Sequence, residues 1–91
     1  MASVFVKSRV ADSGKWKPVF DEHEATRKKF GFKGHSLHRD ADDPNVIIIA
    51  FRVADIGKAK EFANSDDLRS TMMRAGVEGP PEMWFCEDIE G

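Results

Sequence analysis

The sequence predicts an α+β domain built on a four-stranded antiparallel sheet, and three observations carry this prediction. Segments with the apolar spacing of strands and helices follow one another in the order β-α-β-β-α-α-β. Residues that favour turns separate these segments. The run Val46–Val53 has the strongest strand pattern, because it is almost continuously apolar and rich in β-branched residues. No repeat or linker divides the chain, so residues 1–91 are expected to form one domain.

The first strand is expected at residues 4–10, and Asp12 follows it as a cap for a helix. One continuous helix is predicted over residues 16–30, because apolar side chains recur there at helical spacing. The basic triplet Arg27, Lys28 and Lys29 ends this helix. We expect all three side chains to be solvated, since cations suit the last turn of a helix, and the alternative is a contact with a phosphate group.

The remaining elements follow from the same signals of apolar spacing, caps and turns. The expected elements are a strand at residues 32–40, a turn at 40–45, the strand Val46–Val53, a helix at Ile56–Ala63, a helix that begins with Ser65 as its N-cap and ends at Gly76, an extended connector at 79–81 and a strand at 83–89. This order is that of the ferredoxin-like split β-α-β arrangement, in which the helices cover one face of the sheet.

The uncovered face of such a sheet would be unusually apolar in this chain. Every position of residues 46–51 is apolar, and Leu37, Trp84 and Phe85 also place apolar side chains on both faces of their strands. A large exposed apolar face marks an interaction site. A homodimer with two sheets face to face about a two-fold axis is therefore expected. The alternative is a monomer with an atypically apolar sheet.

Composition excludes several classes of partner. The chain has 14 Lys and Arg against 16 Asp and Glu, a net charge of −2, so it lacks the basic footprint of a nucleic-acid-binding protein. The apolar runs are far shorter than the roughly 20 residues that span a bilayer. Cys86 is the only cysteine, which excludes an internal disulfide. A reduced protein in the cytoplasm is the expectation, with no membrane partner.

Three stretches of the sequence resemble the dimeric α+β barrel superfamily, near its antibiotic biosynthesis monooxygenase-like and stress-responsive barrel domains. They are the helix opening Asp12…Lys15-Trp16-Lys17-Pro18-Val19-Phe20-Asp21, the hairpin Arg39-Asp40-Ala41-Asp42-Asp43-Pro44-Asn45, and Ser65-Asp66-Asp67-Leu68-Arg69…Met73-Arg74-Ala75-Gly76-Val77. The resemblance covers nearly the whole chain. It implies a dimeric α/β barrel, and small bacterial proteins of this pattern are named "cyclase" or "monooxygenase" by similarity.

The superfamily includes cofactor-independent monooxygenases on aromatic polyketides, polyketide cyclases, haem-degrading enzymes and chlorite-dismutase-type haem proteins. Their ligands lie between helices and sheet, so the resemblance directs attention to polar residues facing that space. The absence of tyrosine in this chain leaves no counterpart for any tyrosine role in these relatives.

His23 and His38 are the candidate catalytic residues. His23 lies on the apolar stripe of the first helix, and an imidazole there could move a proton to or from an enolisable substrate. If Arg39 pairs with Val46, then His38 shares a face with Phe51 and His35 lies nearer the dimer side, although a shift of one residue in register would reverse this. The alternative for His23 is a core histidine bonded to a backbone carbonyl.

A set of mostly aromatic residues could line a pocket for a small apolar or aromatic ligand, although such residues often form plain core. The candidates are Trp16, Phe20, Ser36, Phe51, Phe62 and Met72. The chain has no H-x-x-x-H, C-x-x-C or H-E-x-x-H spacing, so neither a metal nor another cofactor is expected. The acidic pairs Asp42-Asp43 and Asp66-Asp67 are explained by a turn and by a helix N-terminus.

Two functions remain open at this stage. One is a cofactor-independent monooxygenase or cyclase acting on a small aromatic or polyketide-like substrate. The other is a non-catalytic ligand-binding or stress-associated dimer. A cavity of several hundred Å³ with a histidine in its wall would favour the first, and a space filled by side chains would favour the second.

Overall fold

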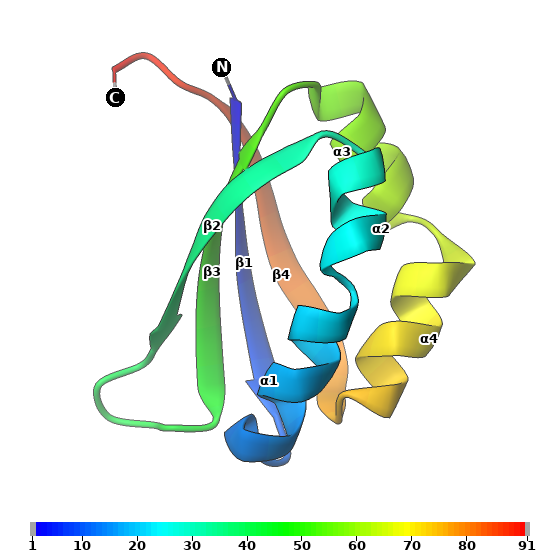
Figure 1. Ribbon diagram of the computed structural model, residues 1–91. Coiled ribbons are helices and arrows are strands. Elements are labelled where there is room, and N and C mark those ends of the chain that lie inside the picture. Colours follow the sequence, from blue (N-terminus) through cyan, green and yellow to red (C-terminus); the bar gives the residue numbers. More distant parts are fainter. Residues whose placement is uncertain (1, 91) are drawn as a thin grey trace.

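The computed structural model describes residues 2–90, so Met1 and Gly91 of the expected domain lie outside the described residues. Strands and helices follow in the order β-α-α-β-β-α-α-β (Figure 1). The elements are β1 (Ala2–Val10), α1 (Ser13–Glu22), α2 (Glu24–Lys29), β2 (Phe32–Arg39), β3 (Val46–Val53), α3 (Ile56–Ala63), α4 (Asp66–Arg74) and β4 (Val77–Glu87).

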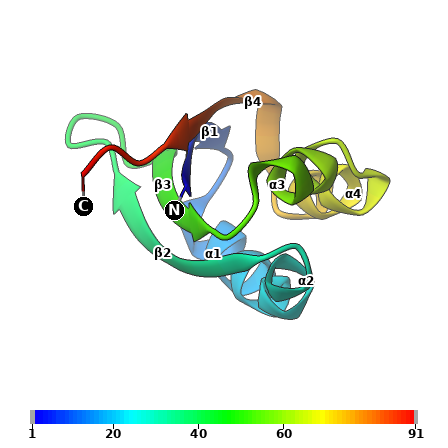
Figure 2. The same cartoon turned by 90° about the horizontal axis from the view of Figure 1, so that it is seen from above.

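The four strands form one antiparallel sheet in the order β2-β3-β1-β4. All helices cover the same face of this sheet, with α1 and α2 over one part of it and α3 and α4 beside them (Figure 2). The predicted α+β, ferredoxin-like fold is therefore confirmed. The core lies between the helices and the sheet, because β1 and β3 turn alternate apolar side chains toward the helices.

The first helical segment begins earlier than predicted and is interrupted. Asp12 caps α1, its side chain accepting a hydrogen bond from the N–H of Gly14 at 2.8 Å. At His23 the backbone has φ −85° and ψ 1°, and the His23 N–H bonds to the Phe20 carbonyl at 3.2 Å. This tight turn separates α1 from α2. The prediction of one helix over residues 16–30 is therefore wrong, and His23 lies at a junction between two helices.

The last strand begins earlier in the sequence than predicted. β4 begins at Val77 and includes Pro80 and Pro81, which the sequence assigned to a connector. The prolines fit because β4 is an edge strand, where a missing N–H costs no ladder bond on the open side. The β1–β4 pairing shifts register between Lys7 and Arg9, opposite this part of β4.

The pairing of β2 with β3 differs by one residue from the prediction. Arg39 lies opposite Ile47 rather than Val46, which places His35 opposite Phe51. Leu37 thereby reaches the covered face, and an irregularity between Phe32 and Gly34 restores Phe32 to the same face. The burial of these apolar side chains sets the register.

The face of the sheet away from the helices carries an exposed apolar patch, next to the polar side chains Ser3, Lys7 and Arg9 of β1. Phe5 is 41% exposed and Trp84 is 48% exposed, and the two residues are cross-strand partners. Half-buried Ala50 and Ile48 of β3 lie beside them on the same face. The sequence prediction that β3 carries apolar residues on both faces is confirmed.

Candidate functional site

An apolar cavity of about 80 Å³ lies between the helices and the sheet. Five of the six residues predicted to line a pocket do line it, namely Trp16, Phe20, Phe51, Phe62 and Met72. Each comes from a different helix or strand except Trp16 and Phe20, which lie one turn apart in α1. The sixth, Ser36, lies on the uncovered face of β2 and does not line the cavity.

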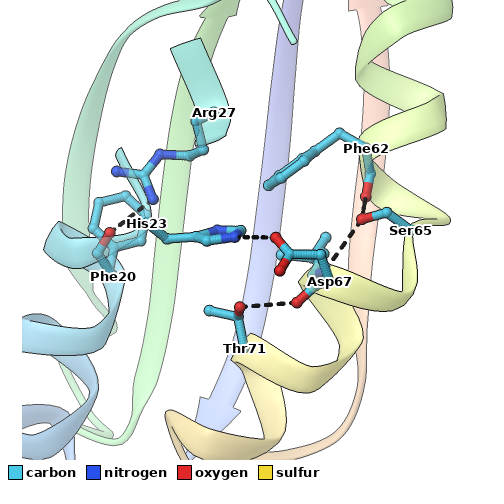
Figure 3. A network of polar contacts seen from close by, with 8 residues as sticks. Phe20, His23, Arg27, Phe62, Ser65, Asp67 and Thr71 are labelled. Atoms are coloured by element: carbon cyan, nitrogen blue, oxygen red, sulfur yellow. Dashed lines mark hydrogen bonds and ion pairs between the residues drawn. The ribbon is translucent and has the colours of Figure 1, made fainter. Parts of the chain in front are cut away.

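His23 forms part of the cavity wall and bonds to the Asp67 carboxylate of α4 (Figure 3). Its Nε2 lies 2.6 Å from Oδ2 of Asp67, and the residue is 7% exposed. Asp67 belongs to the first turn of α4, 44 positions along the chain, and its side chain is 64% exposed. The pair thus links α1 and α2 to α4.

The Asp67 carboxylate defines which nitrogen of neutral His23 carries the proton. An ionised carboxylate can only accept a hydrogen bond, so Nε2 is the donor and Nδ1 keeps a lone pair. No side chain of the described residues bonds to Nδ1. The arrangement is that of a general base oriented by a carboxylate, with its basic nitrogen unoccupied.

Local structure fixes the position of Asp67. Ser65 caps α4, accepting a hydrogen bond from the N–H of Leu68 at 3.1 Å and donating one to the Phe62 carbonyl at 2.7 Å. Thr71 is buried and donates its hydroxyl proton to the Asp67 carbonyl at 2.8 Å. These bonds connect the end of α3 to the first turns of α4 and hold the carboxylate facing His23 (Figure 3).

Arg27 is the second polar residue that the structure brings to the cavity. It is 5% exposed, although Lys28 and Lys29 beside it are exposed, so the expectation that the whole triplet is solvated is wrong for Arg27. Its guanidinium carbon lies 3.8 Å from the centre of the Phe20 ring, and Nη1 donates to the Phe20 carbonyl at 2.8 Å. Burial lowers the pKa of Arg27 from its ordinary value.

The other two histidines lie away from the cavity wall. His38 is exposed and its Nε2 bonds to the Ser36 hydroxyl at 2.9 Å, on the face turned away from the helices. It borders a second and more open groove of about 360 Å³ beside the start of α1. His35, by contrast, is turned toward the helices and meets the edge of Phe20, with 5.1 Å between ring centres. The sequence argument for His38 as a pocket residue depended on the register that the structure corrects.

Asp67 and Arg27 are the site residues that sequence reasoning missed. Arg27 follows His23 by four residues and Phe20 by seven, which is the spacing of one helix face. Arg27 was predicted to be solvated because of its residue type, although its position in the helix favours burial. Asp67 carries no such local signal, because its partner is far along the chain and a helix N-terminus already explains an acidic residue.

Residues 2–90 contain no group of three His, Cys, Asp or Glu side chains close enough to hold a metal ion. Within the same residues, no helix has the length and apolar character needed to cross a membrane. Cys86 is a free thiol on the uncovered side of β4.

Solved structures share this fold over nearly the full chain. SnoaB, a cofactor-independent oxygenase from Streptomyces nogalater, superposes with a TM-score of 0.76 at 15% identity, covering 99% of this chain and 94% of its own. An antibiotic biosynthesis monooxygenase gives a TM-score of 0.71 at 14% identity, with 99% and 100% covered. Rv0793 from Mycobacterium tuberculosis gives 0.71 at 13%, with 99% and 96% covered.

These similarities show that the chain has the ferredoxin-like fold of the antibiotic biosynthesis monooxygenases, as the sequence resemblance implied. No family model matches the sequence, and no curated protein matches it.

Proposed function

We propose that the protein is a cofactor-independent monooxygenase or cyclase that acts on a small aromatic, polyketide-like substrate in the apolar cavity. The observation that carries this proposal is the buried His23, bonded to Asp67 through Nε2 and lining the cavity. The fold shared with SnoaB, described as a cofactor-independent oxygenase, agrees with it.

In this reaction His23 is the general base. Its Nδ1 takes a proton from a carbon next to a carbonyl group, and Asp67 stabilises the imidazolium that forms. The resulting carbanion is delocalised into the aromatic ring and the carbonyl oxygen. It can attack a second carbonyl of the same chain, which closes a ring, and the alkoxide that forms takes the proton back from the His23 imidazolium. Alternatively it reduces O₂ and bonds to it, and the peroxide anion takes that proton to give a hydroperoxide. Cleavage of the O–O bond with loss of the second hydrogen of that carbon then releases water and leaves a carbonyl group.

The cavity must widen for such a substrate. Its volume of about 80 Å³ is smaller than the roughly 150 Å³ of an engineered cavity that binds benzene. The His23–Asp67 bond crosses the gap between the two helix pairs, and the Asp67 end of this bond is exposed. Separation of α1 and α2 from α4 is therefore the opening that we expect to admit substrate.

The small volume is also the observation that favours the second candidate, a non-catalytic ligand-binding or stress-associated dimer. Trp16 and Phe20 stack with 4.8 Å between ring centres and both lie in the wall of the cavity. In that case His23 and Asp67 would act only as a link between helices.

The proposal is tested by proton exchange rather than by a guessed natural substrate. We expect the protein to accelerate deuterium exchange at the carbon between the ring and the carbonyl group of enolisable aromatic ketones, 2-tetralone among them, as followed by NMR in D₂O. Oxygen uptake with the same compounds is measured in parallel. His23→Asn should lower the exchange rate by about a hundredfold or more, while the matched variant His38→Asn should not change it. Equal rates for His23→Asn and the parent protein would refute the role of His23.

We further propose a homodimer formed through the uncovered sheet face. The exposed aromatic pair Phe5 and Trp84, with Ile48 and Ala50 beside it, would be buried between two copies. Sedimentation at micromolar concentration should show a dimer, and Trp84→Lys should shift it to monomer. The matched control Ile89→Lys, at a side chain that is 98% exposed beyond β4, should leave the dimer intact. A monomeric parent protein would refute the proposal.

A further inference from the structure

We propose that the ligand of the cavity is an organic anion, an aromatic acid whose carboxylate binds Arg27. This inference rests on the proposed function in one respect, namely that the cavity takes a ligand. It adds the chemical class of that ligand, and it depends on a residue to which the proton transfer by His23 assigns no role.

The first argument is that no carboxylate of the described residues is in direct contact with Arg27, since Glu24 and Asp21 act on its charge only from a greater distance. Arg27 is only 5% exposed. Within residues 2–90, no carboxylate lies within 4.0 Å of its guanidinium group. Guanidinium stays protonated under these conditions, so the buried group is a full positive charge. Burial of a charge is costly unless a partner offsets it.

The contacts that Arg27 does make use only part of its capacity. A guanidinium carries five N–H donors, and one nitrogen, Nη1, bonds to the Phe20 carbonyl. Stacking over the Phe20 ring adds a cation–π interaction of about 0.5–2 kcal/mol. A carboxylate is the acceptor that fits the remaining donors best, because it can accept two parallel hydrogen bonds from one guanidinium.

The second argument is the charge of the cavity wall. Arg27 is the one permanently charged residue among those of the described chain that line the cavity, and the others are apolar except Ser8, His23 and Thr71. No acidic side chain lines the wall to repel an anion. Arg27 and His23 lie one helical turn apart, so the acid group and the reacting carbon of one small ligand can reach both residues.

Arg27 also borders a small hollow on the surface, beside Lys28, Lys33, His35 and the acidic Glu24. An inorganic anion could bind there without entering the cavity. The two sites are distinguished by the apolar part of the ligand, because only the cavity offers aromatic walls.

The test compares two pairs of probes of the same shape, benzoate with benzamide and 1-naphthoate with 1-naphthamide, by isothermal titration calorimetry at pH 7. We expect each acid to bind at least about tenfold more tightly than its amide. Arg27→Met, which keeps the stem and removes the charge, should abolish this preference without weakening the amides. Arg27→Lys should retain part of it. Saturating inorganic phosphate should leave the affinity for 1-naphthoate unchanged.

Each contrary result has its own meaning. Equal affinities for acid and amide in the parent protein would overturn the inference and leave the proposed function standing. Loss of acid binding in phosphate would overturn it as well, since the surface hollow would then be the site. If no probe binds, both the inference and the proposed ligand cavity fail. Unchanged affinity of the amides for Arg27→Met shows that the variant is folded.

Discussion

The bond between His23 and Asp67 should be measurable as stability, and Asp66 provides a matched control. Both acids lie in the first turn of α4, where a negative charge suits the helix dipole. Asp66 is 96% exposed and pairs only with Arg69, at 3.1 Å. Asp67 instead accepts a hydrogen bond from the imidazole ring of His23, a residue that is 7% exposed. Asp66→Ala and Asp67→Ala therefore remove the same helix-terminal charge but differ in the bond to His23.

The expected difference follows from the burial of His23. Without Asp67, the ring N–H loses its partner in a buried position, which costs about 1–3 kcal/mol. Asp66→Ala should stay within about 0.5 kcal/mol of the parent protein, as is usual for surface substitutions. For a domain of this size each kcal/mol corresponds to about 4–8 °C in Tm, so Asp67→Ala should melt at least about 4 °C below Asp66→Ala.

The assay is thermal and urea unfolding at pH 7, followed by circular dichroism. A double-mutant cycle isolates the pair, because in a His23→Phe background the two alanine variants should become equal. If Asp67→Ala and Asp66→Ala already melt together in the parent protein, the His23–Asp67 bond contributes nothing and the reasoning is refuted.

Two further predictions concern the aromatic core and the acid range. Phe62 is 5% exposed and touches three rings, so Phe62→Ala should cost about 3–5 kcal/mol in urea unfolding, while Met73→Ala, at a 76% exposed position, should cost less than about 0.5. The hydrogen bond from Arg9 at 2.7 Å lowers the pKa of Asp43, so the stability that this carboxylate contributes is present above its unfolded-state pKa and is lost as pH falls through the lowered value. Asp43→Asn should therefore melt lower than the parent at pH 7, and the difference should vanish in acid; a difference that persists below the lowered pKa would contradict this assignment.

The fold followed from the sequence because its strongest signals are local. The strand Val46–Val53 has the same bounds in the structure as in the prediction, since a continuous β-branched run needs no partner to be recognised. The Asp12 and Ser65 caps were predicted for the same reason. The interruption at His23 was not, because a single tight turn inside a helical pattern keeps the apolar spacing almost intact.

The site was harder to predict because it depends on contacts between distant segments. The expected neighbours of His38 depended on strand register, and the one-residue difference turns His38 and Ser36 to the uncovered face while Phe32 keeps its place on the covered face. The spacing of Arg27 places it on the apolar stripe, but it was predicted to be solvated because its side chain is charged. His23 itself was placed correctly in the cavity wall, since a histidine between Phe20 and Phe30 on one helix face points to the sheet.

The central claim is that Nδ1 of His23 is a free basic nitrogen in the cavity, while Nε2 of the same ring donates a hydrogen bond to Asp67. Long-range ¹H–¹⁵N NMR of the histidine rings tests it most directly, with His35→Asn and His38→Asn assigning the three rings. We expect neutral His23 to be protonated on Nε2, and its Nδ1 resonance to shift when 1-naphthoate is added, while His38 does not respond. Protonation of neutral His23 on Nδ1, or a His23 ring that is unaffected when the probe is bound, would contradict the account.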